Sequence, residues 1–209
     1  MDGDNTEKFK IVMLGLDEAG GTTILYQLKD SEIASTSTFF PTIGFNIEFI
    51  KHNDITFEVW DIGGSEEIRH HWPHFSKVKE GVIFVIDSSD ANRLEEAKIE
   101  LENLDRKELH GLPILIYANK QDKTNAIDVK EMVERMNLET LFKNENWHIQ
   151  PSCALTNAGL FAGLDWLNLA LKMTFQLPLC DNSKVEKRDI QNEPADETEA
   201  KKAKTSSYC

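Results

Sequence analysis

The stretch "GLDEAGGTT", from Gly15 to Thr23, decides the fold of this chain. It directly follows the apolar run "FKIVML", so it lies where a buried strand is expected to turn into a helix. Its outline is that of a phosphate-binding loop, G-x-x-x-x-G-K-[ST], in which backbone N–H groups surround a phosphate. Gly21 stands where the loop has its lysine. Taken alone, the stretch fits a working nucleotide site, a damaged one or a glycine-rich turn.

Strand-like and helix-like segments alternate on either side of this loop. Apolar alternation with period two predicts an antiparallel hairpin from residues 45–50 and 55–62. Apolar runs predict further buried strands at 9–16, 81–87, 113–119 and 147–153. Helical periodicity is expected at 21–30, 91–111, 126–138 and 158–175. This order is typical of an α/β domain with a six-stranded, mostly parallel sheet covered by helices on both faces.

The composition divides the chain into three parts. Residues 9–178 hold the apolar segments and are expected to form one domain. Residues 1–8 are acidic and polar, which indicates a short flexible lead-in. Residues 179–209 are polar and lack periodicity, so we expect a disordered tail that cannot bury enough apolar surface to fold.

The net charge of the chain limits the kinds of partner that it can bind. With 36 acidic and 23 basic residues the net charge is −13, which disfavours nucleic acid and anionic membranes as partners. No apolar run reaches the roughly 20 residues of a membrane span. Asp2 stands where N-myristoylation needs glycine, and the lead-in has no amphipathic helix. We expect a monomeric cytoplasmic protein with reduced cysteines, reaching membranes weakly or through partners; palmitoylation of Cys180 and Cys209 is the alternative.

Polar motifs follow four of the expected strands: "GLDEAGGTT", "WDIGG", "NKQD" and "SCAL". Ligands of open α/β sheets bind at the carboxyl ends of the strands, so these turns are expected to lie together. "NKQD" (119–122) fits the guanine-reading pattern N-K-x-D, since Asp122 can accept from a ring N–H and an amine that adenine does not offer. Each motif alone could be a polar turn. Their order favours a guanine-nucleotide site and disfavours an ATP site.

With "PTIGFNIE", "IR..W", "FVIDSSD" and "GLDWL", these motifs make the chain resemble the ADP-ribosylation factor (Arf) and Arf-like family of the Ras-like P-loop superfamily. The resemblance covers residues 9–176 and is more Arf-like than Ras-like in "PTIGFN" and in "WDIGG" followed by Ile68 and Arg69. It implies a Ras-like G domain that binds GTP or GDP with Mg²⁺. It also implies effector and regulatory proteins as partners, in vesicle-mediated transport.

The resemblance assigns the phosphate contacts and the metal. The implied phosphate-binding residues are Gly15, Asp17, Glu18, Ala19, Gly20, Gly21, Thr22, Thr23 and Gly64. Thr22 and Thr42 are the implied Mg²⁺ hydroxyls, and Asp61 is the implied carboxylate that acts on Mg²⁺ through water.

The base and effector contacts are assigned in the same way. The implied guanine-binding residues are Asn119, Lys120, Asp122, Cys153 and Ala154. Phe45, Trp60 and Phe75 match the aromatic triad that the family presents to effectors, although aromatic strand residues also commonly pack in a core.

At two positions this chain lacks a residue that the family uses for GTP hydrolysis. Gly21 removes a charge from the phosphates, and charge-assisted bonds of this kind contribute on the order of 1.5–3 kcal/mol. Ser65 stands at the position of the glutamine that orients the attacking water, where serine is too short and neighbouring Glu66 has the wrong charge. We expect a guanine-nucleotide switch with weak or absent hydrolysis. The alternatives are a pseudo-GTPase interaction module, or an ordinary GTPase if a partner supplies the missing charge.

A histidine cluster lies close to these positions. His70, His71 and His74 could form a metal site, but a solvated patch is the interpretation that we prefer.

Overall fold

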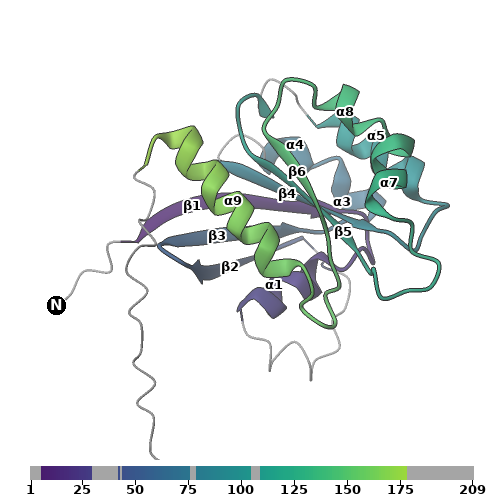
Figure 1. Cartoon of the computed structure of the whole chain (residues 1–209), viewed down its shortest axis with the longest axis horizontal. Helices are drawn as coiled ribbons and strands as arrows, with labels where there is room; N and C mark the ends of the chain where they lie inside the picture. Colours follow the sequence, from purple (N-terminus) through teal and green to yellow (C-terminus); the bar gives the residue numbers. More distant parts are fainter. Residues whose placement is uncertain (1–5, 30–41, 43, 76–78, 105–108, 178–209) are drawn as a thin grey trace, which may run out of the picture. The chain divides into compact units, whose positions relative to one another are not determined.

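The computed structural model describes residues 6–29, 42, 44–75, 79–104 and 109–177 (Figure 1). These residues belong to one compact unit, Met1–Leu179. The predicted tail, 179–209, and residues 1–5 of the predicted lead-in lie outside the described residues.

The described strands form one sheet of six in the order β2-β3-β1-β4-β5-β6. They are β1 (Glu7–Gly15), β2 (Phe45–His52), β3 (Ile55–Ile62), β4 (Gly81–Asp87), β5 (Ile114–Asn119) and β6 (Trp147–Pro151). β2 and β3 pair antiparallel, and the other neighbours in this sheet pair parallel. The predicted mixed, mostly parallel sheet is confirmed.

Strand β1 begins earlier than its sequence indicates. Glu7 and Lys8, placed in the flexible lead-in by their polarity, pair with Ile55 and Thr56 of β3. Both side chains are exposed, so the backbone ladder extends beyond the apolar run. The ordered domain therefore includes two residues that the apolar pattern alone could not assign.

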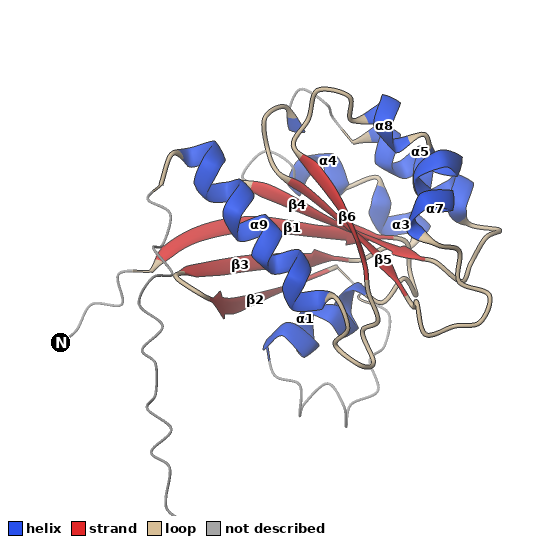
Figure 2. Ribbon diagram, viewed as in Figure 1, coloured by secondary structure: helices blue, strands red, loops and turns tan. Residues whose placement is uncertain are grey.

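Helices cover both faces of the sheet (Figure 2). They are α1 (Gly21–Lys29), α3 (Glu66–Arg69), α4 (Trp72–Phe75), α5 (Leu94–Asn103), α7 (Val129–Met136), α8 (Leu138–Leu141) and α9 (Leu160–Phe175). One core cluster joins α1 and α9 to the sheet, and a second joins α4, α5, α7 and α8 to it. Residues 11–14 of β1 are buried and alternate between the two clusters, which explains their continuous apolar run.

Two predicted helices are shorter than expected, for identifiable reasons. The helix expected over 126–138 begins after Asp128, whose side chain accepts from the Glu131 N–H at 2.8 Å. It ends at Asn137, which has a left-handed φ of 53° and separates α7 from α8. The helix expected over 91–111 ends at Asn103, because Leu104 is already extended.

Gly163 sets the distance between α9 and β5. A Cβ at this position would lie 2.6 Å from the Tyr117 ring and hydroxyl. The Tyr117 hydroxyl donates to the Leu160 carbonyl at 2.6 Å, so the ring is fixed and cannot move aside.

Gly163→Ala is therefore expected to destabilise the protein, although alanine favours a helix by about 1 kcal/mol over glycine. Overpacking of a fixed core typically costs about 1–3 kcal/mol. Urea denaturation measures the difference, and Ala162→Gly, at an exposed neighbouring position, serves as the control for helix propensity. A more stable Gly163→Ala protein would show that the contact is not tight.

Candidate functional site

The phosphate-loop stretch connects β1 to α1. The loop turns through Glu18 and Gly20, which have positive φ of 65° and 97°. A Cβ at Gly20 would lie 2.5 Å from Nδ2 of Asn119, so both the backbone angle and the neighbouring side chain require glycine here. The first turn of α1 follows directly, and the N-terminus of a helix favours an anion.

A cavity of about 550 Å³ opens beside this loop. Its lining includes eight of the nine residues expected to contact phosphate; Ala19 is the exception. Thr42, Asp61, Ser65 and Lys120 line the same cavity. Segments far apart in the sequence thus meet at the carboxyl ends of the parallel strands, as expected for an open α/β sheet.

Three oxygen-bearing side chains converge on one point of the cavity wall. The Thr22 hydroxyl donates to Asp61 Oδ2 at 2.7 Å and lies 2.9 Å from the Thr42 hydroxyl. Burial raises the pKa of Asp61 to about 6, even though the hydrogen bonds from Thr22 and Thr42 lower it. Hydroxyl and carboxylate oxygens are ligands that Mg²⁺ accepts, directly or through water, so this set fits the cation.

Two glycines hold the end of β3 against the loop. A Cβ at Gly64 would overlap the Gly15 carbonyl and the Asp17 amide, and the Asp17 N–H donates to the Gly64 carbonyl at 3.2 Å. The Gly63 carbonyl accepts from the Trp72 indole at 3.1 Å. The segment after β3 is therefore in direct backbone contact with the phosphate loop.

The residues expected to read guanine also come together. Asn119 is buried; its Nδ2 donates to the Ala19 carbonyl at 2.8 Å, and its Oδ1 accepts from the Ala154 N–H at 3.1 Å. Asp122 is exposed and accepts from the Cys153 thiol at 3.2 Å. The carboxylate that would face a base is thus held at the surface by the loop after β6.

Lys120 lies at the edge of the cavity and is already paired. Its Nζ lies 2.6 Å from Asp87 Oδ2 at the end of β4. Burial alone would raise the pKa of Asp87, but the hydrogen bonds from Lys120 and Ser89 outweigh it and lower the pKa. The lysine is therefore held in place by a carboxylate that stays ionised at neutral pH.

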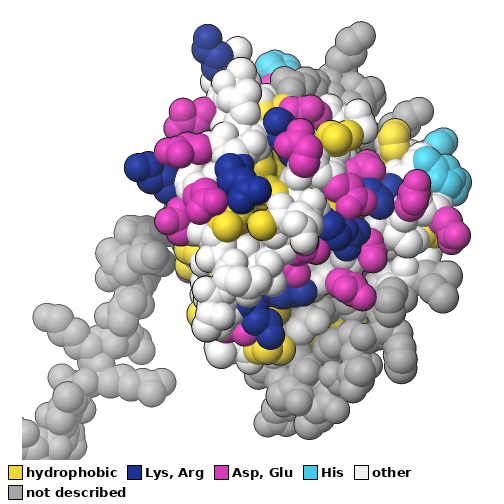
Figure 3. Space-filling view, turned by 90° about the vertical axis from the view of Figure 1, so that its right-hand side faces the viewer, with side chains coloured by type: hydrophobic (Ala, Val, Ile, Leu, Met, Phe, Trp, Pro, Cys, Tyr) yellow, Lys and Arg dark blue, Asp and Glu magenta, His cyan; other side chains and the backbone are white. Residues whose placement is uncertain are grey.

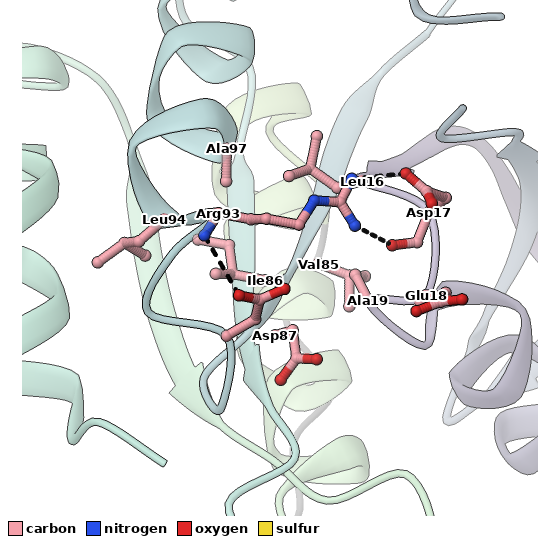
Figure 4. Close-up of a pocket in the computed structure, with 11 residues that line it drawn as sticks. Leu16, Asp17, Glu18, Ala19, Val85, Ile86, Asp87, Arg93, Leu94 and Ala97 are labelled. Carbon is pink, nitrogen blue, oxygen red and sulfur yellow. Dashed lines mark hydrogen bonds and ion pairs between the residues drawn. The ribbon is translucent and has the colours of Figure 1, made fainter. Parts of the chain in front are cut away.

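Arg93 contacts the phosphate loop from outside the cavity, and sequence reasoning missed it. Figure 4 shows its guanidinium directed at the loop, where it donates to the Asp17 carboxylate at 2.6 Å and to the Asp17 carbonyl at 3.1 Å. Its Nε donates to Glu96 at 3.0 Å. The arginine lies 76 positions from Asp17 in the sequence, so no local pattern could have indicated the pair.

The Glu96 carboxylate also connects Arg93 to α3. Its second oxygen accepts from Arg69 at 2.7 Å, and Arg69 also donates to Glu100 at 2.7 Å. The hydrogen bond from Arg93 lowers the pKa of Glu96 most; burial opposes it, and the hydrogen bond from Arg69 adds to the lowering. An ion-pair network thus runs from the phosphate loop through α5 to the segment that carries Ser65.

Ser65 occupies the N-cap position of α3 and lines the cavity. Its side chain makes no capping hydrogen bond, while its carbonyl accepts from the Ile68 and Arg69 N–H groups. Of the two acidic residues that follow Ser65, Glu67 lines this cavity, whereas Glu66 lines a separate groove beside Arg69.

The aromatic triad forms one cluster. The Phe45 ring stacks on Trp60 at 5.7 Å and lies 5.7 Å from Phe75. Trp60 and Phe75 pack against the core, while Phe45 is 52% exposed. Two rings of the triad are thus anchored in the core and the third faces solvent, and contact of the triad with effectors stays a prediction.

The side of the molecule that lies on the right in Figure 1 carries acidic and basic side chains intermixed (Figure 3). His70, His71 and His74 are exposed and have neighbouring ring centroids 4.0 and 6.0 Å apart. Within the described part of the chain, no three His, Cys, Asp or Glu residues are grouped as metal ligands. The solvated patch stays a prediction.

This sheet order, with a phosphate loop after β1 and guanine-type motifs after β5 and β6, defines the fold of a Ras-like small GTPase. The profile of the ADP-ribosylation factor family matches residues 2–171, and the chain belongs to that family. The fold is similar to the structure of the Arl6 BBS3 small GTPase from Trypanosoma brucei with bound nucleotide analogue GppNp. The TM-score is 0.73, with 32% identity over 80% of this chain and 99% of that one.

The predicted family membership is thereby confirmed, and the chain is a member of a family of GTP-binding switch proteins. None of the helices in the described residues is long and apolar enough to span a bilayer.

Asp61→Asn is expected to stabilise the nucleotide-free, Mg²⁺-free protein above pH 6. The pKa of Asp61 is raised from 3.8 to about 6, so ionisation costs folding free energy as the pH rises through this window. Asparagine keeps the hydrogen-bonding shape without the charge. The difference in free energy of unfolding between variant and parent should grow from pH 4 to pH 6 and then stay constant.

Urea denaturation at several pH values, with EDTA present, measures this difference. A difference that is independent of pH would mean that Asp61 is not the group responsible. Asp122→Asn, at an exposed carboxylate, provides the control for a general effect of removing one charge.

Proposed function

We propose that this chain is an Arf-like guanine-nucleotide-binding switch with weak or absent GTP hydrolysis. The observation that carries the proposal is the convergence of the loop, the hydroxyl–carboxylate set and Lys120 of the "NKQD" motif around one cavity. Most of the expected phosphate-binding residues line it, and Asn119 of the same motif is hydrogen-bonded to the loop beside it. A similar structure holding a GTP analogue supports the same assignment.

The protein groups that would hold the nucleotide are of three kinds. Backbone N–H groups of the loop and of the first turn of α1 would bind the phosphates. Thr22, Thr42 and Asp61 would hold Mg²⁺, which when bound supplies positive charge to the phosphate oxygens. Asp122 would accept from the guanine edge while Asn119 keeps the loops in register.

Hydrolysis is expected to be weak because two contributions are missing together. Gly21 supplies no charge to the phosphates, and the Ser65 hydroxyl is too short to orient a water as a glutamine would. The protein would then respond to nucleotide mainly through binding and exchange. An external group could restore turnover only by supplying both effects.

The aromatic cluster is the proposed effector surface. Phe45 is exposed at the start of β2, and Trp60 and Phe75 support it from below. A rigid aromatic patch of this type suits a protein partner, because it offers large contact area at low entropic cost. We place this activity in vesicle or protein trafficking, in the cytoplasm or at membranes through partners, with the chain as a monomer.

A pseudo-GTPase interaction module is the second candidate. The cavity lining includes four carboxylates, Asp17, Glu18, Asp61 and Glu67, which oppose phosphate binding. In that case the fold and the aromatic surface would act without nucleotide.

Titration with fluorescent GDP and GTP in excess Mg²⁺ distinguishes these two functions. Saturable binding that is lost on adding EDTA is expected for the switch. Asp122→Ala should weaken it, because the guanine edge loses its acceptor. Lack of saturable binding at tens of micromolar protein would contradict the switch and favour the pseudo-GTPase interaction module.

Gly21→Lys is expected to tighten nucleotide binding by about tenfold or more, because it restores a charge-assisted contact to phosphate. The position has room for a Cβ, which would lie 3.4 Å from Asp61 Oδ1 and 3.7 Å from Met13 Sδ. Gly21→Met, of similar length and no charge, is the matched control. Equal affinities of the lysine variant and the parent would contradict the account of the loop.

Ser65→Gln alone is expected to restore little GTP turnover, because orienting water cannot help a poorly held phosphate. The double variant Gly21→Lys/Ser65→Gln should turn over faster than either single variant. Single-turnover hydrolysis measures all three. Full turnover in Ser65→Gln alone would show that the loop charge is not needed.

A further inference from the structure

We infer that the outward face of α9 is a docking site for an amphipathic helix of a partner protein, with basic side chains on the flank of that helix. Four apolar side chains form this face, which we call the α9 stripe: Ala162, Trp166, Leu169 and Met173. None of the four lines the nucleotide cavity, so the inference does not rest on the proposed function.

The α9 stripe has the spacing of a helix–helix contact. Its residues follow one another at intervals of four, three and four positions, which is the spacing of alternating d and a positions in a heptad abcdefg. At 3.6 residues per turn, these intervals align the side chains along one side of the helix for about three turns. A second helix with the same spacing can place its apolar side chains between those of the stripe.

The stripe is exposed, although surface helices usually turn charged or polar side chains to water. Leu169 is 47% exposed and Met173 is 67% exposed, Ala162 is exposed, and Trp166 is half-buried. The inner side of α9 supplies its own set of core residues, namely Leu160, Leu164, Leu167 and Leu171. Single exposed apolar residues are common on proteins, but a row of neighbouring ones indicates an interaction surface.

The charges beside the stripe favour a basic partner. Asp165 occupies a g position, which flanks the seam; its side chain is 61% exposed, and it contacts the Asn53 amide at 3.2 Å and the His52 ring at 2.7 Å. Lys172, at the next g position, is held by both oxygens of Asp54 at 2.7 and 2.6 Å. Because charges at e and g positions select the partner, a helix with lysine or arginine opposite Asp165 fits best.

An anionic membrane fits this face less well. Helices that lie on membranes carry several lysines and arginines beside their apolar face, whereas Asp165 and Lys172 are the charged residues of α9. The ring of Phe9 in β1 lies 5.3 Å from that of Phe175, so the exposed Glu7, two residues earlier on the same face of the sheet, adds a carboxylate near the end of the helix.

A second copy of this chain is also a poorer occupant. It would bring the same acidic flank to the contact, and each copy carries a net charge of −13. Stable interfaces bury about 800 Å² on each partner, which is more than four side chains can supply when one is alanine and another half-buried.

The stripe and the aromatic cluster belong to opposite faces of the sheet (Figure 1). α9 packs with α1 in one core cluster, whereas Trp60 and Phe75 pack against the other. A partner bound to α9 therefore leaves the aromatic cluster accessible. We expect its affinity to be the same with GDP and Mg²⁺ as with EDTA.

Fluorescence anisotropy of the full chain with a labelled three-heptad helical peptide tests the inference. The probe has leucine at the a and d positions and lysine at the e and g positions. The parent should bind it saturably, and about fivefold or more tightly than the same peptide with glutamate at e and g, because attraction by the acidic flank becomes repulsion. Asp165→Asn should reduce this difference.

Two variants locate the binding on α9. Leu169→Glu and Met173→Glu should each weaken binding of the lysine peptide by about tenfold or more, because an apolar contact is lost. Each adds a carboxylate, which by itself would attract the peptide, so a weaker complex cannot be an effect of charge. Ile99→Glu, at an exposed apolar position of α5, is the matched control and should bind as the parent does. If thermal denaturation shows that Leu169→Glu is unfolded, the more exposed Met173→Glu decides.

Three results would overturn the inference. The first is equal binding of the lysine peptide to the parent and Met173→Glu, or lack of saturable binding at tens of micromolar protein. The second is self-association in sedimentation that Met173→Glu abolishes, which would assign the stripe to a second copy. The third is binding to vesicles of phosphatidylserine and phosphatidylcholine that the same variant abolishes, which would assign it to a membrane.

Discussion

One buried side-chain amide, that of Asn119, joins the parts of this site. Its nitrogen donates to the phosphate loop at Ala19, and its oxygen accepts from Ala154 in the loop after β6. Both bonds lie inside the protein, where an unpaired polar group is costly, so the geometry of three loops is fixed by one residue. The cradle for phosphate and the surface that would face a base are therefore parts of one rigid unit. Moving either loop would break one of the two hydrogen bonds of Asn119.

Much of this arrangement could be predicted from the sequence. The apolar runs placed the buried strands, because a parallel strand covered on both faces must be apolar throughout. The motifs after them predicted which turns would meet, since strand order brings their carboxyl ends together. What the sequence could not supply was contact between side chains of distant segments. The Arg93–Asp17 pair is the main example, and the pairing of Glu7 with Ile55 is a smaller one.

The chain separates two properties that usually occur together in such a site, its shape and its charge. Shape is retained: Gly20 and Gly64 are required by the close approach of their neighbours, and the buried amide of Asn119 holds the loops. Charge is altered, because Gly21 and the lining carboxylates leave the cavity acidic. Gly20 and Gly64 have to be glycine because neighbouring atoms leave no room for a Cβ. Position 21 is under no such constraint, and the value of a charge there depends on the ligand.

The Glu96 carboxylate bridges two arginines, because one of its oxygens accepts from Arg69 and the other from Arg93. Arg93 in turn holds Asp17 of the phosphate loop, so the loop and the segment after β3 are the two ends of one chain of ion pairs. Side chains of the protein itself therefore connect the two segments at a place outside the cavity.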